Sequence, residues 1–547
     1  MIYSDDPLSR LIRRRPLERD VKSKKALDAA KRLYTECKDS HDACQFSRDS
    51  VLPSRVLDVG TAAEPSLKVF VNDTEQRGDY LALSYCWGGP QKGLLRRNTL
   101  GKMSSDAGIR EKDLQKSVRD AVQVTRMLGF RYLWVDAFCI IQDCNKDKGK
   151  EIGRMATIYK NAALTIAAGT AARAADGFLG GKGSYLPEER AVVRTAGGRG
   201  TVYLRSGGYE PSHTLDSRGW VLQEFLLSSR LLIFSEYELL WQCKKTDLRG
   251  VNEGGLEYLQ LLEGFPWTSF NEDNAGLFGS SDEEKKYLWK TVVEQYTRRL
   301  LSDPEDRLNA LRGITRELEV LWEDSNYFGL WNRWFVELLA WYRPPDIHWQ
   351  EKTKAGEKLT EKVQEQRSMS LAPSWSWASL NQTVMYKGYF IDEDARLKAV
   401  DVMGTRASRH VALSCRILRD EDIFSDELLE EDGDNDGEDK GIEECIDLKT
   451  IDEVGEKETE YLLLGTVMLE GATVGVGLMV VEAGDGFYKR VGLVRFMDME
   501  VWKVHRVTSV SALLSAAAEQ TDGFGNGGME HAAASEKEGT GRRRWEM

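Results

Sequence analysis

Acidic and polar side chains in the segment 133–168 are the strongest sign of chemistry in this sequence. Asp136 follows a short apolar stretch, and Gln142 and Asp143 lie in the polar loop after it. Glu151 opens a predicted amphipathic helix. Clustered acids push each other's pKa values apart, which suits acid–base chemistry or the stabilisation of a cation. A glutamate in a first helical turn also stabilises its helix through the helix dipole, so a structural role for Glu151 stays open.

Predicted strands and helices alternate around these residues. The apolar segments YLALSY, YLWVDAF and ALTIAA are typical of buried strands, and EKDLQKSVRDAVQVTRMLGF and KEIGRMATIYKNA have helical periodicity between them. This alternation predicts an α/β domain with a doubly wound, mainly parallel sheet. Ligands of such sheets bind in the crevice outside the carboxyl ends of the strands, where Asp136 and its neighbours lie.

A third informative block covers residues 216–243, DSRGWVLQEFLLSSRLLIFSEYELLWQC. It predicts a short helix followed by two strands. Helix capping and backbone hydrogen bonding explain Arg218, Gln223 and Glu224 most simply. In the alternative interpretation, Arg218 and Glu224 line the same crevice as Asp136.

The segment YLALSYCWGG (80–89) and the blocks 133–168 and 216–243 occur in the order typical of one family. Together they resemble the heterokaryon incompatibility (HET) domain of filamentous fungi, with a motif core from about Tyr80 to Cys243. The residues of the third block that match the family motif are Arg218, Gly219, Trp220, Gln223 and Glu224.

The HET domain in turn resembles the TIR domain, a relation at the level of a TIR-like or flavodoxin-like fold. In TIR enzymes a glutamate on a helix stabilises the cationic ribosyl centre as nicotinamide leaves NAD. By this resemblance Glu151 is the catalytic candidate. The same resemblance implies a set of substrate-binding candidates, which are Ser84, Tyr85, Trp87, Asp136, Gln142 and Asp143. Core packing is the more common role of large aromatic residues beside a buried strand, and it is the alternative for Tyr85 and Trp87. Many HET domains have a tryptophan three residues before this glutamate, where this chain has Lys148.

The resemblance implies a factor of fungal non-self recognition and regulated cell death, and it leaves three mechanisms open. A signalling module that self-associates or binds a partner protein predicts an apolar or charge-complementary surface on the α/β domain. An NAD glycohydrolase predicts an open pocket that holds Glu151, Tyr85 and Trp87. A fold remnant or regulatory receptor without activity predicts a Glu151 that is buried in a salt bridge. No cofactor is required, and NAD would be a substrate.

Cys37, His41 and Cys44 form a C-x3-H-x2-C pattern at the end of a predicted helix. Zinc sites usually present paired clusters of ligands, and no fourth ligand follows at a matching spacing. We therefore expect a capped helix with half-buried thiols and no metal. HET domains often carry a similar pattern just before the domain, and this resemblance also supports a structural role.

The charge and hydropathy of the chain limit its partners. With 547 residues and a formal net charge of −13, the chain lacks the basic face that nucleic acid or an anionic membrane needs. No apolar run is long enough to cross a bilayer or to form a signal peptide. We expect a cytoplasmic protein that binds a protein partner or itself.

Changes in composition predict the organisation of the whole chain. The predicted segments are a basic lead-in and helix (1–50), the HET domain (51–245) with a hairpin within 180–215, a polar linker (246–285), a Trp-rich helical region (286–385), a β-rich region (386–520) with an acidic disordered loop (419–445), and a disordered tail (521–547).

Overall fold

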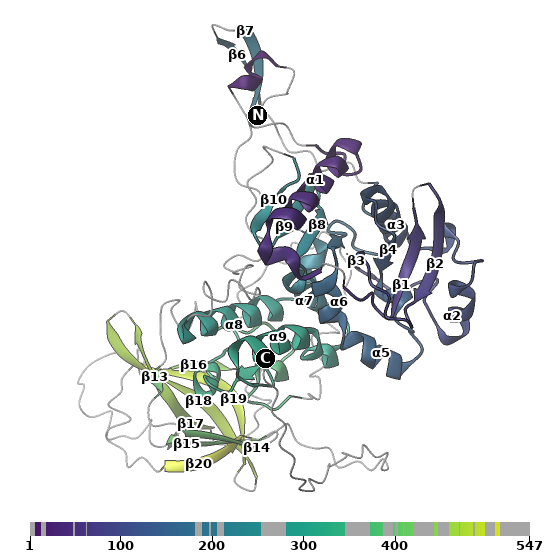
Figure 1. The fold of residues 1–547 in the computed structure, drawn as a ribbon. Coiled ribbons are helices and arrows are strands. Elements are labelled where there is room, and N and C mark those ends of the chain that lie inside the picture. Colours follow the sequence, from purple (N-terminus) through teal and green to yellow (C-terminus); the bar gives the residue numbers. More distant parts are fainter. Residues whose placement is uncertain are drawn as a thin grey trace, which may run out of the picture.

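The α/β region is built on one eight-stranded sheet (Figure 1). The computed structural model describes residues 6–11, 18–47, 50–61, 63–180, 189–195, 198–204, 213–252, 281–344, 372–386, 398–399, 403–407, 410–419, 442–446, 459–469, 471–484, 487–497 and 509–514. The strands of the sheet are β1 (Arg55–Gly60), β2 (Pro65–Val71), β3 (Tyr80–Ser84), β4 (Tyr132–Trp134), β5 (Leu164–Ala167), β8 (Arg230–Phe234), β9 (Leu239–Cys243) and β10 (Thr246–Gly250). Their order across the sheet is β10-β9-β8-β5-β3-β4-β1-β2.

The centre of this sheet is parallel and its edges are antiparallel. Strands β4, β3, β5 and β8 run parallel, which confirms the predicted α/β class. Strands β1 and β2 at one edge, and β9 and β10 at the other, pair antiparallel. Short turns join β8, β9 and β10, and such turns allow only antiparallel neighbours. The chain goes from β3 to β4 on one side and then to β5 on the other side of β3, so the sheet has a switch point between β3 and β5.

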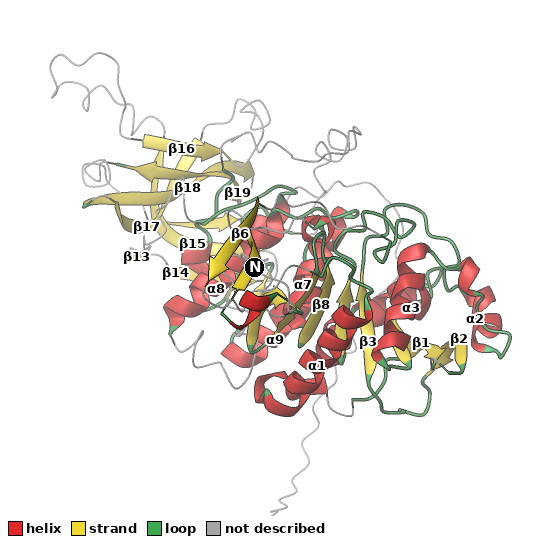
Figure 2. Cartoon of the chain, turned by 90° about the horizontal axis from the view of Figure 1, so that it is seen from above, coloured by secondary structure: helices red, strands yellow, loops and turns green. Residues whose placement is uncertain are grey.

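Helices cover both faces of the sheet. On one face, α1 (Lys24–Ser40) and α3 (Lys116–Leu128) pack in one core with Leu81 and Leu83 of β3. On the other face, Tyr80 and Ala82 pack against α6 (Met155–Asn161), and α7 (Gly219–Leu227) covers β8. Figure 2 shows β8 between α1 and α7. Because side chains alternate along a strand, Ser84 shares the α7 face with Tyr80 and Ala82.

Helix α1 forms as the apolar spacing predicts. The Ser23 hydroxyl accepts a hydrogen bond from the Ala26 amide at 3.1 Å and caps the first turn. Ala26, Ala30 and Cys37 are buried along one side, and Leu33 is half-buried beside them. The predicted helix is therefore confirmed, and its apolar side lies on the sheet.

The predicted helix over residues 150–162 is two helices. Helix α5 (Asn145–Ile152) begins earlier, in the polar run after Cys144, and ends at Gly153. Helix α6 then starts at Met155. Glycine has low helix propensity, which explains a break at this position. Glu151 therefore lies in the last turn of α5, and its predicted place in a first helical turn is wrong. The helix dipole does not favour a carboxylate at this end.

The structure describes parts of the remaining predicted segments. Strands β6 (Glu189–Thr195) and β7 (Gly198–Leu204) form the predicted hairpin. Strand β10 occupies the start of the predicted linker 246–285, so the sheet extends beyond residue 245, while 253–280 lie outside the described residues. Strand β16 (Ile442–Ile446) occupies the end of the predicted acidic disordered loop 419–445, so this prediction is wrong for residues 442–445, while 420–441 lie outside the described residues. The tail 521–547 also lies outside them.

The Trp-rich region and the β-rich region form the second half of the molecule. The Trp-rich region contains α8 (Asp282–Thr297), α9 (Arg312–Trp322) and α10 (Phe335–Leu338). The strands of the β-rich region that pair with one another are β13 (Lys398–Ala399), β14 (Met403–Ala407), β15 (His410–Arg419), β16, β17 (Thr459–Leu469), β18 (Ala472–Gly484), β19 (Phe487–Phe496) and β20 (Ser509–Leu514). Figure 1 shows α8 and α9 between this sheet and the α/β region.

One hydrophobic core joins these regions. Leu222 and Phe225 of α7 belong to the same buried cluster as Trp289, Trp331 and Leu478 of the second half. The α/β region and the second half, which differ in composition, therefore bury each other's apolar side chains. No helix in the described part of the chain is long and apolar enough to cross a membrane.

Gly313 of α9 allows this half to approach the α/β region closely. A Cβ atom at Gly313 would lie 2.4 Å from the Cβ of Ala156 on α6 and 2.5 Å from Oε1 of Gln223 on α7. We expect Gly313→Ala to lower the free energy of unfolding by about 1–3 kcal/mol, because the backbone of α6 must shift. Thermal and urea unfolding of the purified protein measure this effect.

Gly101→Ala is the matched control. Gly101 also lies in a helix, α2 (Arg97–Ser104), and no atom lies within 4 Å of the position that a methyl group there would take. This change should raise the free energy of unfolding by roughly 0.5–1 kcal/mol through helix propensity. Equal stability of the two variants would contradict the close approach of α6, α7 and α9.

Candidate functional site

Polar side chains from all three sequence blocks meet on the α7 face of the sheet, at the carboxyl ends of β3 and β4. Arg218 directly precedes α7, and its Nη1 donates a hydrogen bond to the Tyr85 carbonyl at 2.6 Å. Asp136 begins the short helix α4 (Asp136–Cys139) directly after β4, and its Oδ2 accepts a hydrogen bond from Trp87 Nε1 at 2.8 Å. Segments far apart in the sequence thus meet at the carboxyl ends of the central strands, where the strand pattern predicts ligand sites.

Glu224 is the buried acid of this cluster. Its side chain projects from α7, and the residue is 8% exposed. Burial raises the pKa of Glu224 from 4.5 to about 7, while the nearby Ser84 hydroxyl and the Arg218 guanidinium oppose the rise. The negative charge of Asp136 adds to it. A carboxyl with a pKa near 7 can donate or accept a proton at physiological pH.

Asp136 is held in the same environment. Its carboxylate also accepts a hydrogen bond from the Ala137 amide at 2.7 Å. Burial raises the pKa of Asp136, and the hydrogen bonds from Trp87 and Ala137 limit this rise. Two acids near one guanidinium therefore share a single positive partner, Arg218.

Three buried polar atoms of this cluster make no hydrogen bond of good geometry with the described residues, although Ser84 lies beside Glu224 and Tyr85 beside Asp136. The three atoms are Ser84 Oγ, Tyr85 Oη and Glu224 Oε2. An unsatisfied buried polar group costs about 1–3 kcal/mol, and such groups usually meet water or a ligand. The cluster therefore keeps unused donors and acceptors in the interior, at the carboxyl ends of β3 and β4.

The other motif residues of α7 serve packing. The Gly219 amide donates to Leu300 O at 2.8 Å, and a Cβ at Gly219 would lie 2.6 Å from the Leu301 side chain. Trp220 Nε1 donates to Asp306 at 3.2 Å. Gln223 Oε1 accepts from the Gly313 amide at 2.8 Å. These three residues bind α7 to the helical region and do not line the polar cluster.

The structure pairs Glu151 with Arg55, which is not among the residues predicted to surround it. Glu151 is 1% exposed, and its Oε1 lies 3.9 Å from Nη2 of Arg55 at the start of β1. Arg55 makes a closer ion pair with Asp147, at 2.6 Å. Neither carboxylate oxygen of Glu151 has a hydrogen-bond partner among the described residues. Glu151 is therefore turned to the interior of the domain, and it stays a site candidate by resemblance.

Gln142 and Asp143 support the loops around the cluster. Gln142 Nε2 donates to the carbonyls of Asp136 and Ile140, each at 3.1 Å. Asp143 is exposed, and its Oδ1 accepts from the Arg97 amide at the start of α2, at 2.9 Å.

Tyr159 is a residue that the sequence reasoning missed. It is buried on α6, its hydroxyl donates to Leu83 O at 3.1 Å, and burial together with the charges of Glu224 and Asp136 raises its pKa. Its place in the segment KEIGRMATIYKNA, between Glu151 and the strand ALTIAA, could have indicated from the sequence that Tyr159 lies near the site.

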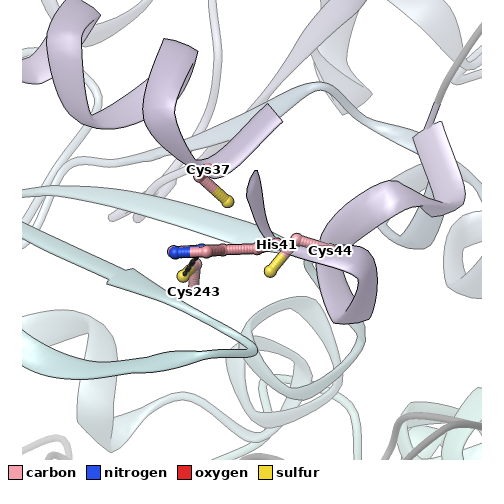
Figure 3. Close-up of side chains that lie close together, drawn as sticks. All are labelled: Cys37, His41, Cys44 and Cys243. Atoms are coloured by element: carbon pink, nitrogen blue, oxygen red, sulfur yellow. Dashed lines mark hydrogen bonds between the residues drawn. The ribbon is translucent and has the colours of Figure 1, made fainter. Parts of the chain in front are cut away.

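A second cluster contains the residues that could hold a metal. Cys37, His41 and Cys44 come together with Cys243, the last residue of β9, and their potential ligand atoms all lie within 4.8 Å of one another (Figure 3). The expectation that a fourth ligand is missing is therefore wrong. Sequence spacing did not reveal it, because Cys243 lies 202 residues after His41.

The fold and the polar cluster define a class of protein: an α/β domain with a doubly wound parallel centre and a buried acid–arginine site at its switch point. Residues 80–224 match the family model described as heterokaryon incompatibility protein (HET), so this part of the chain is a HET domain. This confirms the family that the sequence motifs predict. No curated protein and no solved structure matches the chain.

The raised pKa of Glu224 predicts a pH-dependent stability. Between pH 4.5 and 7 the folded protein keeps a proton on Glu224 that the unfolded chain has released, so the free energy of unfolding falls as pH rises through this window. Glutamine in Glu224→Gln resembles the protonated glutamate, so the free energy of unfolding of this variant should not fall over this pH range. We expect the variant to match the wild type near pH 5 and to exceed its free energy of unfolding at pH 8 by roughly 3 kcal/mol.

Urea unfolding at several pH values measures this difference. Glu64→Gln is the control, because Glu64 is exposed and its variant should follow the wild type at every pH. A Glu224→Gln protein that is no more stable than the wild type at pH 8 would contradict the buried, proton-binding state of Glu224.

Proposed function

We propose that this chain is a heterokaryon-incompatibility-type factor of fungal non-self recognition and regulated cell death, and that its HET domain acts in the cytoplasm as a signalling and self-association module. The family match over residues 80–224 supports the family-level part of this proposal. The burial of Glu151, 1% exposed and beside Arg55, argues against catalysis by Glu151; it is the state expected of a regulatory receptor without activity, and it is compatible with a module that signals by binding. A carboxylate that stabilises a ribosyl cation must reach the substrate, whereas Glu151 contacts the interior of the domain.

Helix α7 is a suitable transmitter for such a module. Arg218 and Glu224 face the polar cluster, whereas Trp220 and Gln223 bind Asp306 and Gly313 of the helical region. A change at the cluster therefore acts on a helix that also holds the second half of the molecule. This supports a protein in which binding at the α/β region is transmitted to the C-terminal half.

The signalling mechanism predicts that Glu151→Gln retains function. Expression of the full chain and of this variant in a fungal host should cause equal loss of viability, because glutamine preserves the shape of the buried side chain. Neither purified protein should consume NAD, and circular dichroism confirms that both are folded. Sedimentation velocity of the wild type should show an oligomer that grows with concentration. Viability loss and NAD consumption that both disappear in Glu151→Gln would contradict the proposal.

An NAD-cleaving enzyme is the second candidate. The unpaired polar atoms Ser84 Oγ, Tyr85 Oη and Glu224 Oε2 favour it, because they offer a small polar substrate several hydrogen bonds at the switch point. In this version Glu224, whose burial raises its pKa to about 7, takes the proton-transfer role instead of the Glu151 that the TIR resemblance implies, and the buried cluster must open to admit the substrate. NAD consumption that Glu224→Gln abolishes and Glu151→Gln preserves would support this candidate.

A further inference from the structure

The cluster of Cys37, His41, Cys44 and Cys243 lies on the α1 side of the sheet. Cys37 is in the last turns of α1, His41 follows the helix, and Cys44 lies in the 3-10 turn Asp42–Ser47. The three cysteines are 0% exposed, and none of them is in a disulfide. Figure 3 shows their side chains converging from the end of α1, the following turn and β9.

The geometry of the cluster fits a tetrahedral ion. Ligand atoms that surround zinc at about 2.3 Å lie about 3.8 Å from one another. Here all four potential ligand atoms lie within 4.8 Å of one another, and Cys243 Sγ is 3.5 Å from His41 Nδ1. A small inward movement of the side chains reaches the required distances. Three thiolates and one imidazole are a donor set of structural zinc sites, and soft sulfur ligands disfavour magnesium and calcium.

The charge around the cluster fits the same ion. Three thiolates and one zinc ion carry a net charge of −1. Arg230 is 2% exposed, its Nε donates to Cys37 Sγ at 3.1 Å, and its Nη2 donates to the Cys44 carbonyl at 2.6 Å. The hydroxyl of Thr246 lies 3.0 Å from Cys243 Sγ. A buried guanidinium against sulfur is favourable when that sulfur is anionic, and outer-shell hydrogen bonds of this kind orient metal ligands.

We propose that Cys37, His41, Cys44 and Cys243 bind one zinc ion, which joins the N-terminal helix α1 to strand β9 of the sheet. All four positions are filled by side chains, so the ion has a structural role. The ion closes the chain between His41 and Cys243, 202 residues apart, and it lies outside the HET match over 80–224. This inference does not depend on the proposed function.

Metal analysis of the purified full-length protein is the direct test. Mass spectrometry of metals should find about one zinc per chain. After exchange into cobalt(II), the protein should show thiolate-to-cobalt charge-transfer absorption and the strong visible bands of a tetrahedral site. Full-length, folded protein that holds no zinc and shows no such absorption on titration with cobalt(II) overturns the proposal. A disulfide among the three cysteines in protein isolated under reducing conditions also overturns the proposal.

Variants identify the ligands. Cys243→Ser should reduce bound zinc to below about a tenth of the wild-type content. His41→Cys should keep the metal as a four-thiolate site with increased charge-transfer absorption. Cys139→Ser is the matched control, because Cys139 is also buried and free but lies in α4, outside the cluster, and its zinc content should equal that of the wild type. A folded Cys243→Ser protein with full zinc content overturns the assignment of the fourth ligand. If Cys243→Ser does not fold, the cobalt spectra of the wild type and His41→Cys decide.

Discussion

The burial of helix α7 is the constraint on which the rest of the structure depends. Apart from the half-buried Trp220, its residues are buried, because one side faces the sheet and the other faces α8 and α9. A helix that is apolar on nearly all sides needs such an environment. Its few polar residues must therefore find partners inside the protein, and this requirement brings Arg218 and Glu224 to the carboxyl ends of the strands.

The unpaired polar atoms of the cluster reduce the free energy of unfolding. Buried polar atoms without partners, such as Ser84 Oγ and Tyr85 Oη, cost free energy that a set of apolar residues would not. Places where a protein departs from the rules of core packing are commonly functional sites. Residues of all three sequence motifs converge on these atoms, which makes the carboxyl ends of β3 and β4 a candidate functional site of the HET domain.

The sequence predicted those features that depend on local periodicity. Strands β3, β4 and β5 and helix α1 were recognisable from their apolar spacing, and the family resemblance grouped Asp136 with Ser84 and Tyr85. The break between α5 and α6 was missed, because the polar run before Glu151 extends the helix backward and Gly153 ends it. The sequence did not show that Cys243 lies close to Cys44, because only the order of the strands in the sheet brings β9 beside the end of α1. No local pattern reveals that order.

The limits of the family match do not coincide with a folding unit. The match begins at β3 and ends within α7, so it excludes β1, β2, β8, β9 and β10 of the same sheet. Leu239 and Trp241 of β9 pack in the core that α1 completes, and α7 buries its other side against Trp289 of α8. A fragment cut at residues 80 and 224 would expose both surfaces to water. The HET domain is therefore the part of the chain that carries the recognisable site, while its stability depends on the N-terminal helix and on the Trp-rich half.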